Sequence, residues 1–268
     1  MTSPNHDTTP GQRPASRSNP IIVTLLLCIA ILLAVIAIIL VVRPGRSNTS
    51  APEQVSAQAP TAASGEPTTI ETAAPSQTDA ELLELMHGEV RRNADDSQAK
   101  GKVDAPVVMV VYSDFACPFC TKFAQEVEPE LADLVDDGTL RVEWRDLAQI
   151  TATSPLAAQG GIAAGNQGKF WEFHDAVYRA ADPTDHPEYT EDSLVAFAQE
   201  AGVPDLEKFR ADLKDAATVQ AVEDAKQHAY SLGIQGTPFF IINDAYVNGY
   251  ADAGYMRNTI LNQAAAAR

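Results

Sequence analysis

A pair of cysteines directly after a run typical of a buried strand constrains the fold of this chain more than any other feature. Residues 106–112 (PVVMVVY) are apolar and rich in β-branched side chains, with a proline at their edge, which favours a buried strand. The motif Cys117-Pro118-Phe119-Cys120 follows. Apolar side chains then recur every three or four positions, which predicts a helix that bends at Pro129. We therefore expect the cysteine pair where this helix begins.

A cysteine at the start of a helix is chemically activated. Unpaired backbone N–H groups and the helix dipole stabilise a thiolate, so the pKa of Cys117 is expected to fall below ~8.5, into the range of about 3.5–7.5. The thiolate is the species that attacks a disulfide. We expect Cys117 to be exposed, and Cys120, one turn further on and more buried, to resolve the mixed disulfide. Pro118 suits the first helical position, because its missing N–H would have no partner there.

The small number of cysteines limits the other interpretations of this pair. By itself, a CxxC pair is compatible with a surface disulfide or with half of a metal site. The chain has three cysteines, and the third, Cys28, lies in an apolar run. A disulfide that closes so short a loop stabilises a fold very little, and a structural zinc site needs more ligands than the pair supplies. Redox chemistry is therefore favoured, with no metal and no cofactor.

The patterns around the motif indicate a βαβ unit. A short helix is predicted at 81–91, before the buried strand. Leu140, Val142 and Trp144 alternate with polar residues, which predicts a second strand. A strand, a helix and a strand in this order form a right-handed parallel βαβ unit.

The rest of the chain reads as helices, followed by two strands and a last helix. Between the second strand and the hairpin, helices are predicted at 155–165, 169–180, 191–201, 206–213 and 219–231. Strands at 239–242 and 245–247 are joined at Asn243-Asp244, a hairpin signal. A helix at 254–267 closes the chain. The prediction is an α/β fold with an all-helical insertion at about 152–232.

Residues 1–78 differ in composition from this domain, which we place at 79–268. Residues 21–42 carry no charge, and as a helix of about 33 Å they match the ~30 Å hydrocarbon core of a membrane. A cleaved secretory signal has a shorter apolar stretch, of about 7–15 residues, so we expect a single uncleaved transmembrane helix. Residues 1–20 form a polar tail. Residues 43–78, rich in Ala, Pro, Ser and Thr, are expected to be a disordered linker.

The flanking charges leave the orientation of residues 21–42 open, because two arginines precede the run and two follow it. The predicted chemistry places residues 1–20 in the cytoplasm and the domain outside it, since disulfides persist outside the cytoplasm. The chain is thus expected to be a single-pass protein of the cell membrane. Cys28 has leucines before it and further apolar residues after it, which favours a small hydrophobic residue over a lipidated one.

The charge balance excludes one class of partner. The formal net charge is −17, and so acidic a surface repels the phosphates of nucleic acids. We expect a monomer that does not bind nucleic acid.

A second motif, Gly236-Thr237-Pro238, stands before the strand at 239–242. Proline does not fit inside a central strand. A cis peptide bond at Thr237-Pro238 would let the strand begin after a tight turn and leave the Thr237 backbone free. Since few X–Pro bonds are cis, this motif gains weight only together with the CxxC pair.

Together these motifs resemble the DsbA-like family of extracytoplasmic thioredoxin-fold thiol–disulfide oxidoreductases, particularly its membrane-anchored Gram-positive members. The resemblance covers about 95–265 and rests on residues 101–107 (GKVDAPV), 112–120 (YSDFACPFC), 145–147 (RDL), 167–175 (QGKFWEFHD) and 236–240 (GTPFF). It implies a thioredoxin fold with a helical insertion, a redox-active pair at Cys117 and Cys120, and a cis-proline loop at Gly236, Thr237 and Pro238 that binds the substrate chain. It also implies unfolded exported or cell-surface proteins as substrates, and a quinone-linked membrane partner as reoxidant.

The chain departs from the family pattern near the motif. Many relatives have an acid six residues before the first cysteine, where this chain has Val111. Asp114 is the nearest acid in sequence, and we consider two roles for it, capping of the turn or handling of the Cys120 proton. Phe119 stands where strongly oxidising members have His, so we expect a less oxidising protein with a Cys117 pKa above about 4.

Two further sites are expected to be structural. Leu147-Ala148 replaces the aromatic residue and proline that follow the Arg-Asp pair in relatives, and we expect it to pack in the core. We expect the same of His174.

The sequence thus predicts a thiol–disulfide oxidoreductase that forms or exchanges disulfides, with oxidation favoured over isomerisation or reduction because such bonds persist outside the cytoplasm. The alternative is a thioredoxin-like chaperone or assembly module whose cysteines are not essential. Replacement of both cysteines by serine distinguishes these hypotheses.

Overall fold

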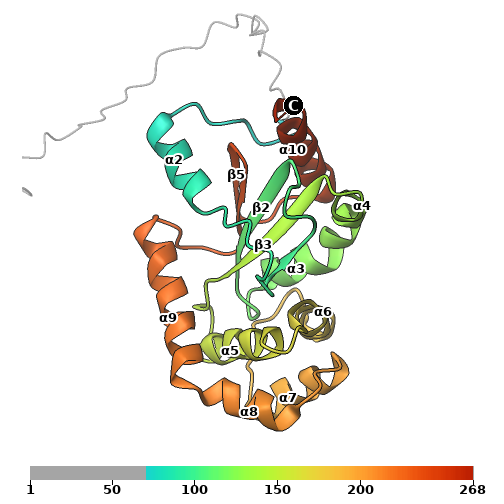
Figure 1. Ribbon diagram of the computed structural model, residues 1–268, viewed down its shortest axis with the longest axis vertical. Coiled ribbons are helices and arrows are strands. Elements are labelled where there is room, and N and C mark those ends of the chain that lie inside the picture. Colours follow the sequence, from blue (N-terminus) through green and yellow to red (C-terminus); the bar gives the residue numbers. More distant parts are fainter. Residues whose placement is uncertain (1–70, 268) are drawn as a thin grey trace, which may run out of the picture. The chain divides into compact units, whose positions relative to one another are not determined.

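A computed structural model describes residues 71–267 of the chain (Figure 1). The predicted tail at 1–20, the transmembrane helix at 21–42 with Cys28, and most of the linker lie outside these residues. Of the helices within 71–267, none combines the length and apolar character that a membrane crossing requires.

A mixed five-stranded sheet forms the centre of the domain, in the order β1-β3-β2-β4-β5. β2 and β3 are parallel, and the other neighbouring pairs are antiparallel. The strands are β1 (Ala99–Lys100), β2 (Val107–Ser113), β3 (Leu140–Asp146), β4 (Phe239–Ile242) and β5 (Ala245–Asn248). The predicted βαβ unit and hairpin are confirmed, whereas β1 was not predicted, because two residues are too few to show a pattern.

Helices cover both faces of this sheet and form the insertion (Figure 1). Those outside the insertion are α2 (Ala80–Gly88), α3 (Pro118–Glu126), the 3-10 helix η1 (Glu128–Leu131), α4 (Ala132–Asp136) and α10 (Ala253–Ala266). Between β3 and β4 lie α5 (Ser154–Gly165), α6 (Phe170–Ala180), α7 (Glu191–Glu200), α8 (Leu206–Lys214) and α9 (Ala216–Ser231). The predicted all-helical insertion is confirmed, and the bend expected at Pro129 is the 3-10 helix between α3 and α4.

Alternate residues of β2 face two different hydrophobic clusters. Val107, Met109 and Val111 lie in the cluster that contains both site cysteines. Val108 and Val110 lie in the cluster on the other face of the sheet. Every residue of β2 is buried, as the near-continuous apolar run predicts.

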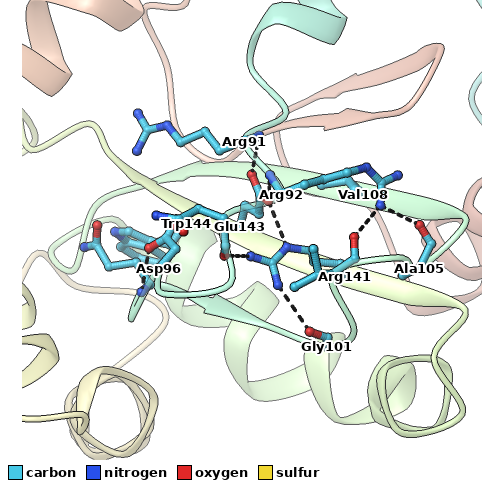
Figure 2. A network of polar contacts seen from close by, with 12 residues as sticks. Arg91, Arg92, Asp96, Gly101, Ala105, Val108, Arg141, Glu143 and Trp144 are labelled. Carbon is cyan, nitrogen blue, oxygen red and sulfur yellow. Dashed lines mark hydrogen bonds and ion pairs between the residues drawn. The ribbon is translucent and has the colours of Figure 1, made fainter.

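Arg141, Glu143 and Arg145 of β3 are buried as well, and they form an ion-pair network (Figure 2). One carboxylate oxygen of Glu143 accepts hydrogen bonds from Arg141 Nε at 2.9 Å and from the backbone N–H of Arg92 at 2.8 Å. The other accepts from the Arg91 N–H and from Arg145, each at 3.0 Å. Burial alone would raise the pKa of Glu143, but these bonds lower it to about 2. The network fixes β3 to the segment that follows α2.

Residues before 79, the start that we predicted for the domain, also pack against it. Ala74 is buried, and its N–H donates to Thr259 Oγ1 at 2.8 Å. The N–H of Gln77 donates to the carbonyl oxygen of Asp244 at 2.7 Å. Residues 71–78 therefore contact the domain, although their composition is typical of a linker.

Candidate active site

The first cysteine of the pair begins helix α3. Cys117 is the N-cap residue and Pro118 the first helical residue, as predicted. The N–H of Cys117 donates to the carbonyl oxygen of Asp114 at 3.0 Å, which closes the turn after β2. The backbone N–H groups of Cys120 and Phe119 lower the pKa of the Cys117 thiol. The start of the helix therefore presents several donors to one sulfur atom.

The predicted cis-proline loop lies against this sulfur. The peptide bond between Thr237 and Pro238 is cis, and the Cys117 thiol donates to the carbonyl oxygen of Thr237 at 3.3 Å. The antiparallel pairing of β2 with β4 places Tyr112 opposite Phe239. This register brings the loop to the end of β2, where α3 begins.

The expectation that Cys117 is exposed was wrong, because its exposed fraction is 2%. The Thr237 carbonyl oxygen lies 3.3 Å from the sulfur. Phe119, by contrast, is 59% exposed. The site thus lies just beneath the surface that Phe119 marks.

The two cysteines differ in how readily they lose a proton. A hydrogen bond from Cys120 is the largest of the effects that lower the pKa of Cys117 to about 6, with burial acting against it. The Thr237 hydroxyl and the backbone N–H groups lower it further. Burial, together with the neighbouring Cys117 sulfur, raises the pKa of Cys120 well above its ordinary value. At neutral pH the pair is therefore one thiolate and one thiol.

Thr237 offers Cys117 a different group in each protonation state. The thiol donates to the Thr237 carbonyl oxygen. The thiolate has no proton to donate, and the Thr237 hydroxyl stabilises it by lowering the pKa of Cys117. Within residues 71–267 this buried hydroxyl has no hydrogen-bond partner, so it is available to a Cys117 thiolate. Gly236, the third residue assigned to the loop, is exposed and has open space around it.

The contacts of Asp114 support the capping role among the two that the sequence left open. Oδ1 accepts from the N–H of Ala116 at 2.8 Å. Oδ2 accepts from the N–H groups of Gln149 at 2.7 Å and Ile150 at 2.8 Å. The buried carboxylate is thus occupied by backbone donors, and it ties the turn before Cys117 to the loop after β3.

A family model described as Thioredoxin matches residues 93–261, well over half of the chain. This chain belongs to the thioredoxin family. The match contains the cysteine motif, the whole helical insertion and the cis-proline loop.

Similar proteins place the chain in the DsbA-like branch of the thioredoxin family, as predicted. "Probable disulfide bond formation protein D" of Bacillus cereus is 33% identical over 157 residues, which cover 57% of this chain and 70% of that protein. The structure of BdbD from Bacillus subtilis has a TM-score of 0.59 at 24% identity. The match covers 65% of this chain and 95% of the BdbD chain.

A second group of relatives is much longer. "Na(+)/H(+) antiporter NhaA 1" of Salinispora arenicola is 32% identical over 165 residues, 60% of this chain and 23% of that protein. The chain spans about a quarter of the length of such antiporters.

Val111 is buried, with Trp144 and Phe240 opposite it on the neighbouring strands. The position where many relatives have an acid is therefore part of the apolar core here. Leu147 and Ala148 are also buried, which confirms the packing predicted for them.

Sequence reasoning missed a pair of buried hydroxyl groups at the turn before Cys117. Ser113 ends β2, and its Oγ lies 3.0 Å from the hydroxyl of Tyr178 on α6. Both side chains are buried. Ser113 stands within the family motif and could have been noticed there, but a tyrosine 65 positions further on gives no local signal.

The described residues hold one cluster with the donor atoms of a metal site. Ligand atoms of Glu128, His174 and Asp175 lie within 4.8 Å of one another. Lys100 Nζ is 3.3 Å from Glu128, and Nδ1 of His174 is 2.9 Å from Asp175, so these carboxylates already have partners. His174 is buried with its ring 4.8 Å from that of Tyr178, which supports the packing role predicted for it.

Proposed function

We propose that the protein is a thiol–disulfide oxidoreductase whose working pair is Cys117 and Cys120. The observation that carries this proposal is the environment of the Cys117 sulfur, 3.3 Å from the Thr237 carbonyl oxygen and with its pKa lowered to about 6. A sulfur that is anionic at neutral pH is a good nucleophile and a good leaving group in thiol–disulfide exchange. Cys120 lies behind it as a thiol.

The exchange runs as two displacements at sulfur. A substrate thiolate, its proton released to water, attacks Sγ of Cys117 in the oxidised pair. The S–S bond breaks and its electron pair goes to Cys120. A second substrate thiolate then attacks the substrate sulfur of the mixed disulfide, and Cys117 leaves as a thiolate. The substrate loses two electrons and gains a disulfide, and the enzyme pair is reduced.

The low pKa of Cys117 favours donation of disulfides over the reverse direction. Every unit by which the pKa is lowered stabilises the reduced, anionic form by about 1.4 kcal/mol, and about 30 mV of reduction potential corresponds to a similar energy. Oxidation is therefore the proposed direction, ahead of isomerisation or reduction.

The substrate chain is proposed to lie along the loop of Gly236, Thr237 and Pro238. Its backbone would take the place of the Cys117 thiol as partner of Thr237. Because Cys117 is 2% exposed, substrate approach requires a local opening, and exposed Gly236 is the place in the loop with room for it.

The proposed location is the cell membrane, with residues 21–42 as a single-pass anchor, residues 1–20 in the cytoplasm and the domain outside. The uncharged run of 22 residues supports the anchor, and the persistence of disulfides outside the cytoplasm supports the orientation. The proposed substrates are unfolded exported or cell-surface proteins. A membrane redox partner is proposed to reoxidise the pair.

The test is oxidation of a reduced, unfolded protein by the purified full-length chain in detergent. We expect disulfide formation in the substrate, one disulfide per oxidised pair. Cys117→Ser with Cys120→Ser should abolish it, and Cys28→Ser should not. If the double variant still returns the unfolded substrate protein to its active folded form, the chaperone or assembly role is correct and the proposed function is wrong.

A further inference from the structure

The loop that is proposed to bind the substrate is held by few hydrogen bonds. Within the described part of the chain, residues 235–237 take part in two. The carbonyl oxygen of Thr237 accepts from the Cys117 thiol at 3.3 Å, and the carbonyl oxygen of Gln235 accepts from the side-chain Nε2 of Gln149 at 2.9 Å. Gln235 and Gly236 are exposed, so packing does little to hold them. The position of the loop therefore depends on Cys117 and on Gln149.

The hydrogen bond from Cys117 depends on the state of the cysteine pair. A sulfur in a disulfide carries no hydrogen, and neither does a thiolate, so the thiol alone donates to the Thr237 carbonyl oxygen. In the proposed function the oxidised pair is the form that meets the substrate. The substrate backbone then becomes the partner of Thr237. The hydrogen bond from Gln149 to Gln235 needs no proton from sulfur, so it persists through these changes.

The amide of Gln149 is held at both ends. Its Oε1 accepts from the hydroxyl of Tyr230 on α9 at 2.6 Å. Because the carbonyl oxygen of Gln235 can only accept, the Nε2 end of the amide must face the loop. Tyr230 thus keeps the amide turned toward Gln235 before any substrate arrives.

The backbone of Gln149 reaches the turn before Cys117. Its N–H donates to Oδ2 of Asp114 at 2.7 Å, and the carbonyl oxygen of Asp114 accepts from the N–H of Cys117 at 3.0 Å. Asp114 is 2% exposed, so this connection is sheltered from water. Gln149 therefore joins the turn that carries the nucleophile to the loop that is proposed to carry the substrate.

We propose that Gln149 is a positioning residue that sets the place of the substrate-binding loop relative to Cys117. It holds Gln235 while the Thr237 carbonyl oxygen exchanges the cysteine thiol for the substrate backbone. Opening at exposed Gly236 then takes place beside a fixed point. Without the Gln149 side chain, the loop spends less time in the binding position, and the apparent affinity for a polypeptide falls by the same fraction. This inference rests on the proposed function and deepens it.

The experiment compares how two dithiols reduce the oxidised full-length protein in detergent. One is a short unstructured peptide with two cysteines, and the other is dithiothreitol. A thiolate of either attacks Cys117, but only the peptide has a backbone that can lie along the loop. The thiol state of the protein is read by alkylation and mass spectrometry after an acid quench.

Gln149→Met keeps the length of the side chain and removes both of its hydrogen bonds. It should raise the half-saturating peptide concentration about fivefold, the factor that one neutral hydrogen bond of ordinary strength supports. The maximal rate with the peptide and the rate constant with dithiothreitol should each fall less than about twofold, because the loss is one of binding.

Two further variants separate the hydrogen bonds of this amide. Gln149→Glu keeps an oxygen for Tyr230, but at neutral pH it has no proton to donate to Gln235. It should therefore raise the half-saturating concentration at least as much as Gln149→Met. Tyr230→Phe keeps the ring and leaves the amide free to turn, and we expect a rise of about twofold.

Gln167→Met is the matched control. Gln167 lies between α5 and α6 and is half-buried, as Gln149 is. Its side chain donates to the carbonyl oxygen of Asp205 and accepts from the N–H of Asp205, each at 3.0 Å. The variant loses two hydrogen bonds in the helical insertion and none to the loop, so the peptide and dithiothreitol should react with it as with the parent.

A parent-like half-saturating concentration in both Gln149→Met and Gln149→Glu overturns the inference. So does an equal loss of rate with the peptide and with dithiothreitol, since the variant then damages the cysteine pair rather than the loop. If Gln149→Met does not fold, Gln149→Glu and Tyr230→Phe decide between the same outcomes. Failure of the parent to oxidise the peptide, by contrast, overturns the proposed function itself and is seen before any variant is made.

Discussion

The sulfur of Cys117 lies 3.3 Å from the carbonyl oxygen of Thr237, although the two residues are 120 positions apart in the chain. The antiparallel pairing of β4 with β2 creates this contact. It places the nucleophile of the proposed reaction directly beside the backbone that is proposed to hold the substrate.

Thr237→Val should raise the pKa of Cys117 by about one unit, since one hydrogen bond to an anion is lost. The measurement is thiolate absorbance as a function of pH. Thr121→Val is the matched control, because Thr121 also has a buried hydroxyl without a partner within residues 71–267. An equal shift in both variants, or none in Thr237→Val, contradicts the assigned role of the Thr237 hydroxyl.

The stability of the reduced protein should increase with pH. Cys117 has a pKa of about 6 in the folded chain and about 8.5 in an unfolded one. Ionisation of Cys117 therefore stabilises the folded state. This stabilisation is lost as the pH falls through 6 and gained as the pH rises toward 8.5. We expect the free energy of unfolding of the reduced form, relative to the oxidised form, to rise by about 2–3 kcal/mol between about pH 5 and pH 8.

Urea denaturation of the two forms measures this difference, and reduced Cys117→Ser should not show the rise. Above about pH 8.5 the trend should reverse, because burial keeps Cys120 protonated in the folded state while it ionises in the unfolded one. A flat difference across the whole range is incompatible with the low pKa of Cys117.

Phe119→His should make the protein more oxidising. A protonated imidazole near the Cys117 thiolate stabilises the reduced form, and we expect the pKa of Cys117 to fall by about one unit and the potential to rise by about 30 mV. Because Phe119 is 59% exposed, the exchange should change stability little. Phe119→Leu is the control and should leave both values unchanged. A potential that falls in Phe119→His would refute the explanation.

Glu143→Ala should destabilise the domain by about 3–5 kcal/mol, because it leaves the buried guanidinium groups of Arg141 and Arg145 without their carboxylate. Chemical denaturation measures this loss. Glu200→Ala is the control, since it breaks an exposed ion pair with Arg179 and should cost less than about 1 kcal/mol. A similar loss of stability in both variants would show that burial of the ion-pair network is not the reason that it stabilises the domain.

Local patterns predicted the parts of the fold that depend on local physics. The β-branched run of β2 and the proline after Cys117 determine a strand and the first turn of a helix from neighbouring residues alone. The helical insertion follows from Gly, Pro and Asp signals between apolar stripes. The cis-proline loop was predicted only because two motifs, at Cys117 and at Thr237, supported each other.

The features that the sequence did not predict depend on contacts between distant segments. Residues 71–78 are ordered through hydrogen bonds such as that of Ala74 with Thr259, which composition does not reveal. The burial of Cys117 comes from the Thr237 loop, and Tyr178 reaches Ser113 from the insertion. Each depends on how helices and loops dock, which no short window of the sequence contains.

The most direct test of the central claim is the redox equilibrium of the full-length protein in glutathione buffers, with the thiol state of Cys117 and Cys120 read by alkylation and mass spectrometry. We predict one two-electron transition that involves both cysteines, at a potential above about −200 mV. A potential near that of cytosolic thioredoxin, about −270 mV, would contradict an oxidase, and the absence of a Cys117–Cys120 disulfide at any buffer composition would contradict the whole account.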